Sequence, residues 1–98
     1  MNVELMKEFA NEPYASRYTM RIDGALVGVL DYAVNGSAIS FVRSFTNPQY
    51  RGNGYAGELV EFAANDVENS SAKKIIPMCW YVADWFAAHP DRAGLLAR

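Results

Sequence analysis

Residues 49–56 read Gln-Tyr-Arg-Gly-Asn-Gly-Tyr-Ala, and this stretch divides the chain into two halves with different hydrophobic periods. Before it, apolar and polar residues alternate as in strands, and after it, apolar residues recur every three or four positions as in a helix. Gly52 and Gly54 let the backbone bend and leave no Cβ in the way of a ligand. The stretch is therefore predicted to be a strand-to-helix turn, whose first helical amides are free to bind an anion such as a phosphate.

This turn also has a simpler interpretation. Arg51 would add a charge-assisted hydrogen bond to an anion, but the glycines could serve the backbone alone, with Asn53 as the helix N-cap. The stretch has neither the Gly-Lys-Ser/Thr of a Walker motif nor the three glycines of a dinucleotide-binding fingerprint. Spacing alone therefore leaves a phosphate-binding turn and a purely structural turn open.

The first half of the chain is predicted to be an antiparallel meander. Strands are expected at residues 2–7, 17–22, 25–34 and 37–45, with a turn at 11–13. Asp23-Gly24 and Asn35-Gly36 are hairpin signals, because both turn positions favour a positive φ. One face of the last strand is expected to carry Ile39, Phe41 and Phe45.

The second half is predicted to be α-β-α. An apolar stripe follows the turn, formed by Ala56, Leu59, Val60, Ala63 and Val67. We expect a helix over about 53–68, a short strand at 74–78 and a second helix at 80–88 that Pro90 ends. The spacing of Trp80, Trp85 and Phe86 indicates core positions. The fold class is thus α+β in layers, of order β-β-β-β-α-β-α, and the absence of repeats or linkers predicts a single domain over residues 1–98.

Composition excludes several classes of function. The 98 residues are 51% apolar and carry 9 basic and 11 acidic side chains, so one small core is expected and a polycationic nucleic-acid surface is not. One cysteine cannot form an internal disulfide, and one cysteine with one histidine is too few for a zinc site. The N-terminal residues lack the pattern of a signal peptide, and no apolar run reaches the length of a membrane span. We therefore expect a cytoplasmic protein without metal, nucleic-acid or membrane partners.

Three short motifs give the chain a family resemblance. Gln49-x-x-Gly52-x-Gly54 resembles the acyl-CoA-binding motif of the GCN5-related N-acetyltransferases, Gln/Arg-x-x-Gly-x-Gly/Ala. Pro77-Met78-Cys79 and His89-Pro90 resemble the minimal YjdJ-type branch of that family, which has about this length. Members of this branch often carry His-Thr in the strand before the motif, and here Arg43-Ser44 occupies that place.

The resemblance implies a GCN5-related fold that binds acetyl-CoA as its co-substrate. It implies that the amides of the turn hold the coenzyme pyrophosphate and that the pantetheine lies between the strand ends at 45–46 and 79. The implied cofactor-binding residues are Phe45, Thr46, Arg51, Gly52, Asn53, Gly54, Tyr55, Ala56 and Cys79. No metal is implied.

The implied activity is an N-acetyltransferase, which passes the acetyl group directly to a primary amine within a ternary complex. The acceptor would be a protein lysine or N-terminus, or a small polyamine, because few residues cover the acceptor side between the first two strands. The alternative is a non-catalytic acyl-CoA-binding module or sensor. The protein is expected to be a monomer or a weak dimer.

Three side chains are candidates for the chemistry. Cys79 is a buried small hydrophobe, a wall of the acyl pocket, or a nucleophile that is briefly acylated. Tyr81 resembles the family tyrosine that protonates the leaving thiolate, or packs its ring at the core edge. His89 is a base candidate because histidine titrates near neutrality, and its alternative role is to cap the carbonyls of the second helix.

Overall fold

The computed structural model describes residues 6–97. Its strands are β1 (Lys7–Glu12), β2 (Arg17–Ile22), β3 (Ala25–Asn35), β4 (Ala38–Thr46) and β5 (Lys74–Pro77). Its helices are α1 (Tyr55–Ser70) and α2 (Trp80–Ala88), with short 3₁₀ turns at Pro13–Ala15, Pro48–Tyr50 and Pro90–Leu95. The α+β class and the order β-β-β-β-α-β-α are confirmed.

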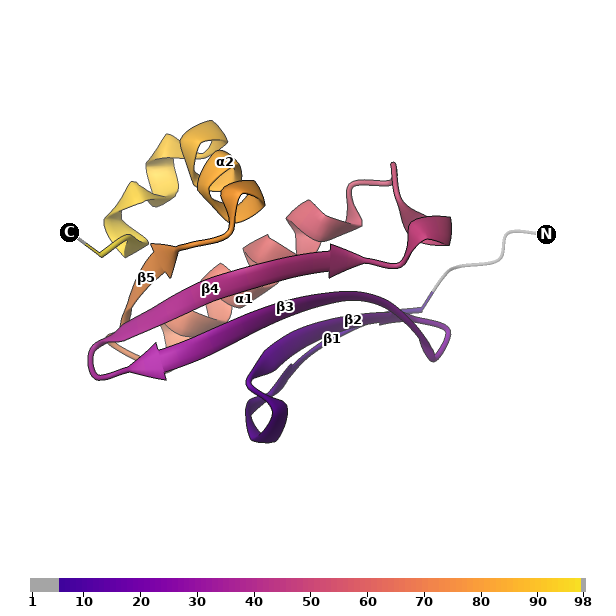
Figure 1. Ribbon diagram of the computed structural model, residues 1–98, viewed down its shortest axis with the longest axis horizontal. Coiled ribbons are helices and arrows are strands. Elements are labelled where there is room, and N and C mark those ends of the chain that lie inside the picture. Colours follow the sequence, from indigo (N-terminus) through magenta and orange to yellow (C-terminus); the bar gives the residue numbers. More distant parts are fainter. Residues whose placement is uncertain (1–5, 98) are drawn as a thin grey trace.

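The five strands form one sheet in the order of the chain. Strands β1 to β4 are an antiparallel meander, and β5 joins β4 in parallel. Two neighbouring parallel strands need a crossover connection. Helix α1, which lies between β4 and β5 in the sequence, provides it by running back along the sheet (Figure 1). None of the helices within residues 6–97 has the length and apolarity needed to span a membrane.

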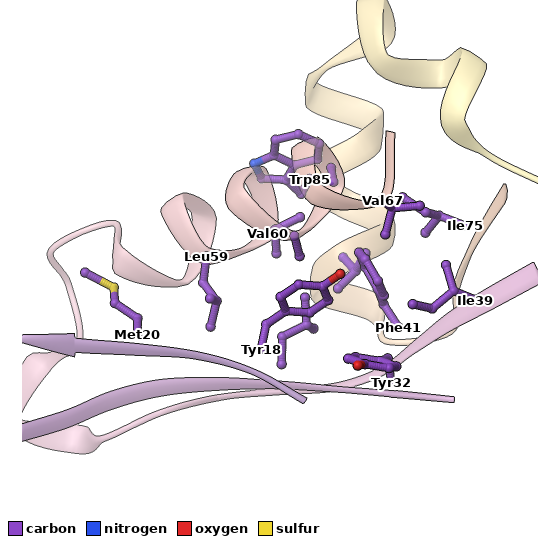
Figure 2. Packing of buried hydrophobic residues seen from close by; sticks show 14 of the residues in the cluster. Tyr18, Met20, Tyr32, Ile39, Phe41, Leu59, Val60, Val67, Ile75 and Trp85 are labelled. Carbon is purple, nitrogen blue, oxygen red and sulfur yellow. The ribbon is translucent and has the colours of Figure 1, made fainter. Parts of the chain in front are cut away.

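The core lies between α1, α2 and one face of the sheet. Five side chains of α1 are buried, and four of them belong to the predicted five-residue stripe. The buried residues are Leu59, Val60, Ala63, Ala64 and Val67. They pack on Tyr18, Met20 and Phe41, which are almost fully buried (Figure 2). Burying each large apolar side chain stabilises the fold by roughly 1.5–3 kcal/mol, so the sheet holds the start of α1 firmly in place.

The first strand that the structure describes, β1, lies almost wholly after the strand expected at 2–7. Residues 1–5, which carry most of the strand expected at 2–7, lie outside the described residues, and β1 runs from Lys7 to Glu12. The turn expected at 11–13 was therefore wrong for Asn11 and Glu12, which belong to β1, and the turn begins at Pro13. The reason is tertiary, because Phe9 stacks on Phe62 of α1 at 5.3 Å and the Tyr32 hydroxyl donates a 2.7 Å hydrogen bond to Asn11 Oδ1.

A β-bulge in β4 also corrects the predicted face of Phe45. Tyr32 pairs with Phe41 but Asp31 pairs with Arg43, so Val42 is an extra residue on β4. Ile39 and Phe41 face the core as predicted and are 4% and 0% exposed. After the bulge the alternation is inverted: Ser44 and Thr46 now share the face of α1, and Phe45 turns to the opposite face with 38% exposure.

Candidate functional site

A cavity of about 470 Å³ opens where β4, the glycine-containing turn, α1 and α2 meet. Its lining residues come from three segments that are distant in the sequence. They are Ser44, Phe45, Thr46, Tyr50, Arg51, Gly52, Gly54, Tyr55, Ala56, Cys79, Trp80 and Tyr81. The end of β4, the turn predicted to bind phosphate and the junction between β5 and α2 therefore form one site.

The cavity lies beside the part of β4 that extends beyond its pairing with the shorter β5. Their parallel register runs from Ala38 to Phe41 on β4 and ends at Pro77 on β5. Beyond it, the amide of Cys79 donates a 3.0 Å hydrogen bond to the carbonyl of Phe41. The last residues of β4 then follow β3 alone, and their free edge becomes a wall of the cavity.

Two left-handed glycines shape the turn at the other end of the cavity. Gly52 has φ +85° and Gly54 has φ +78°, backbone angles that residues with a side chain rarely adopt. A Cβ at either glycine would have no neighbouring heavy atom within 4 Å. Both positions therefore border open space, which a ligand can approach closely.

The turn is tied back to the strand that precedes it. Arg51 Nε donates a 3.2 Å hydrogen bond to the carbonyl of Thr46, the last residue of β4. Asn53 Nδ2 donates at 2.9 Å to the carbonyl of Tyr50. The predicted N-cap at Asn53 was wrong, because α1 begins at Tyr55 with the left-handed Gly54 as its cap.

The structure brings together eight of the nine residues expected to bind the cofactor. Asn53 is the exception, because it does not line the cavity and its amide is used inside the turn. Three further lining residues lay outside the expected set: Ser44, Tyr50 and Trp80. The resemblance did not imply Ser44, and the face on which Ser44 lies depends on the bulge at Val42, which has no signal in the alternation of residues.

Cys79 lies at the junction of β5 and α2. It is the N-cap residue of α2 and is partly exposed, with part of its surface packed at the edge of the core. The thiol is therefore neither fully buried nor fully solvated, and it lines the cavity directly. This position is compatible with a wall of an acyl pocket and with an attacking group.

Tyr81 also lines the cavity, in the first turn of α2. Burial raises the pKa of its phenol above the ordinary value, so the hydroxyl keeps its proton at neutral pH. A Cβ added to Gly57 of α1 would lie 3.4 Å from the Tyr81 hydroxyl. The missing side chain at Gly57 thus allows Tyr81 to sit close against α1.

His89 lies at the far end of α2 and does not line the cavity. Its Nδ1 is 2.7 Å from the carbonyl of Trp85, and its ring stacks on the Trp85 indole at 4.0 Å. These contacts are those of the capping alternative. Because one helix length separates His89 from Tyr81, the structure does not bring the three catalytic candidates together.

The aromatic residues of α2 divide into two groups. Trp85 and Phe86 are 9% and 4% exposed, as expected for core positions. Trp80 was expected in the core as well, and this was wrong: it is 75% exposed and borders the cavity. Trp80 is the first residue of α2, and the first buried residue of this helix is Val82.

The comparison with protein families supports one assignment. A family model described as GCN5-related N-acetyl-transferase matches residues 17–95. A search of curated proteins gave no match. Within residues 6–97 no group of three or more His, Cys, Asp or Glu residues is arranged to hold a metal ion. The matched region contains β2 to β5, both helices and the whole cavity, and the chain belongs to the GCN5-related N-acetyltransferase family.

Proposed function

We propose that this protein transfers an acetyl group from acetyl-CoA to a primary amine. The observation that carries the proposal is the continuity of the cavity, which runs from the turn with Gly52 and Gly54 to the thiol of Cys79. One end offers helix amides to phosphate oxygens, and the other lies where two strands diverge. This arrangement fits a long substrate with an anionic head and a reactive thioester tail.

The turn is suited to the anionic part of coenzyme A. The first amides of α1 have no partner inside the helix, and the helix dipole adds positive potential there. Charges at an exposed helix end interact by roughly 0.3–1 kcal/mol each, so several contacts together are needed. Arg51 keeps guanidinium donors beyond the Nε that binds Thr46, and these are available to a phosphate.

The reaction forms an N–C bond and breaks a C–S bond. The neutral amine attacks the thioester carbonyl, and the oxygen gains negative charge. The amine nitrogen then loses one proton to water, the C–S bond breaks, and the sulfur leaves as a thiolate that takes up a proton. In this proposal a backbone amide at Phe45 or Thr46 stabilises the oxygen, and the Tyr81 hydroxyl protonates the sulfur. Both groups border the cavity. A phenol is protonated at neutral pH, and burial raises the pKa of Tyr81 further above its ordinary value.

The acceptor would approach from the side on which the sheet is uncovered. Only the turn Pro13–Ala15 lies between β1 and β2, so no helix shields this side. Three apolar side chains near the divergence of β4 and β5 are exposed, namely Val42, Ile76 and Met78. An open apolar surface suits a chain that carries its amine to the site, such as an exposed lysine, a protein N-terminus or a polyamine.

The test is to mix the protein with acetyl-CoA and separate amine panels and to follow the release of free thiol. The panels are lysine peptides, peptides with free N-termini, and polyamines. Turnover with one panel supports the proposal and names the acceptor class. Tight coenzyme binding without turnover on any panel contradicts it.

One observation favours a second candidate, a non-catalytic acyl-CoA-binding module. The residues that line the cavity include no His, Asp or Glu, and Arg43-Ser44 stand where related chains often carry His-Thr. Such a module would show a thermal shift with coenzyme A and no acetyl transfer. An equal shift with ATP would instead indicate a general phosphate-binding site.

A further inference from the structure

An ion pair between β1 and α1 lies beside the proposed coenzyme site. Lys7 Nζ is 3.0 Å from Glu58 Oε1, and it also lies 5.1 Å from the centre of the Tyr55 ring. Tyr55 is the first residue of α1 and lines the cavity. Neither Lys7 nor Glu58 lines the cavity, but Tyr55 connects the pair to the end of the cavity at which the phosphates are proposed to bind.

Glu58 has two opposing effects at this place. It lies in the first turn of α1, where a carboxylate stabilises the helix dipole. The same negative charge opposes an anionic ligand bound at that helix end, because like charges repel across distances comparable to the Debye length. An acid that is good for the helix is thus unfavourable for the proposed coenzyme.

Lys7 removes this conflict. Its ammonium contacts the Glu58 carboxylate directly, and the side chains of both residues are 37% exposed. In addition, the ammonium makes a cation–π contact with the ring of Tyr55, a residue that lines the cavity. Lys7 is 45 residues before Gly52 in the chain, so neither the motif nor its spacing points to it.

We infer that Lys7 is an electrostatic component of the coenzyme site, which neutralises Glu58 and makes the start of α1 attractive to the phosphates. The inference rests on the proposed function, since it concerns the same cavity. It assigns to the edge strand β1 a part in affinity for the anionic substrate. Lys7 acts here as a positioning residue for charge and takes no part in bond making.

The experiment measures the dissociation constants of coenzyme A and of pantetheine, which lacks the phosphates, by calorimetry. The variants are Lys7→Met, Glu58→Gln and the double variant. Lys74→Met is the matched control, since it also removes one positive charge but lies at the other end of α1, which is 16 residues or roughly 24 Å long. Thermal melting verifies that each variant is folded.

We expect Lys7→Met to weaken coenzyme A binding about fivefold and Glu58→Gln to strengthen it by a similar factor at low salt. The double variant should bind about as the unmodified protein does, and Lys74→Met should leave the affinity unchanged. Both effects should shrink at high salt and be absent with pantetheine.

Two results would overturn this inference. Unchanged coenzyme A affinity in both single variants would show that the pair has no influence on the site. Equal changes for coenzyme A and pantetheine would show that Lys7 acts through the structure of the cavity instead of through charge. If the unmodified protein does not bind coenzyme A at all, the proposed function itself fails, and the two failures are thereby distinguished.

Discussion

The amide of Cys79 donates a 3.0 Å hydrogen bond to the carbonyl of Phe41, and this bond joins the beginning of α2 to the middle of β4. It marks the point at which β4 and β5 separate. Because Cys79 is held by its backbone, its thiol has a defined position on the wall of the cavity. Substitutions of this side chain can therefore be made without loss of the bond that shapes the site.

This rigidity makes Cys79→Ala a clean test of the thiol. We expect a partial loss of turnover of about fivefold, since removing one partly buried atom from the wall of an acyl pocket costs about 1 kcal/mol of packing. Steady-state kinetics of acetyl transfer should give intersecting lines for both proteins, as direct transfer in a ternary complex requires. Near-complete loss of turnover with intact coenzyme binding, together with parallel lines in the unmodified protein, would instead identify Cys79 as a nucleophile.

Replacing Gly54 by valine should abolish saturable binding of coenzyme A. A β-branched residue strains the left-handed backbone by about 1–2 kcal/mol, and its side chain fills the open space beside the first amides of α1. Gly36→Val is the matched control, because Gly36 also has a positive φ and open surroundings but lies in the hairpin between β3 and β4. Fluorescence of the exposed Trp80, with calorimetry as a second measurement, reports binding.

Both variants should lose comparable stability in thermal melts. Only Gly54→Val should lose the ligand. If Gly54→Val binds coenzyme A as tightly as Gly36→Val does, the turn is a structural element and the phosphate assignment is wrong.

Tyr81→Phe should lower kcat by about a hundredfold, the lower end of what a positioned general acid contributes. Coenzyme binding should change little, because the ring that packs at the cavity wall is retained. Tyr14→Phe provides the control, since Tyr14 is 86% exposed and is not among the residues that line the cavity. An unchanged kcat in Tyr81→Phe would leave the phenol with a packing role alone.

The partly buried hydrogen bond from the Tyr18 hydroxyl to Asp66 Oδ2, 2.7 Å long, should contribute strongly to stability. Tyr18→Phe leaves the carboxylate without this donor, so we expect the free energy of unfolding to fall by roughly 1.5–3 kcal/mol. Tyr32→Phe removes a bond of the same length to the neutral Asn11 amide and should cost less. Urea titrations of both variants provide the comparison, and equal losses would contradict the role of the charge.

The same phenol predicts a dependence on alkaline pH. Burial, with the Asp66 carboxylate as a second cause, raises the pKa of Tyr18 in the folded protein. Its neutral form is therefore favoured by folding, and the stability it contributes is present below about pH 10, the ordinary range of tyrosine, and is lost as the pH rises beyond it. Tyr18→Phe should show a weaker loss of stability in this range.

Much of the fold could be predicted because local signals agreed with tertiary packing. The hairpins at Asp23-Gly24 and Asn35-Gly36 and the apolar stripe of α1 carry strong periodic patterns, and their elements formed as expected. The first strand was misplaced because its partner contacts, such as Phe9 on Phe62, join segments far apart in the chain. Alternation within a few residues does not contain that information.

The candidate site was indicated in a different way. Spacing alone left the role of the glycine stretch open, but its resemblance to the family motif named a continuous run of residues, and most of them line the cavity. Trp80 and Lys7 could not be placed in this way. Whether a helix end projects from the core, and which strand passes beside it, depends on the packing of the whole domain.

The extra residue Val42 in β4 has a consequence for how this strand tolerates change. Before Val42, the side chains of odd-numbered residues such as Phe41 point into the core. After Val42, even-numbered residues such as Ser44 face that same side of the sheet. The two halves of β4 thus have different roles and opposite alternation: the first half covers the core, and the second half lines the cavity. Deleting one residue here would move each side chain in the second half of the strand to the opposite face of the sheet, while leaving the length of the strand almost unaltered. The bulge therefore determines which side chains of β4 face the cavity.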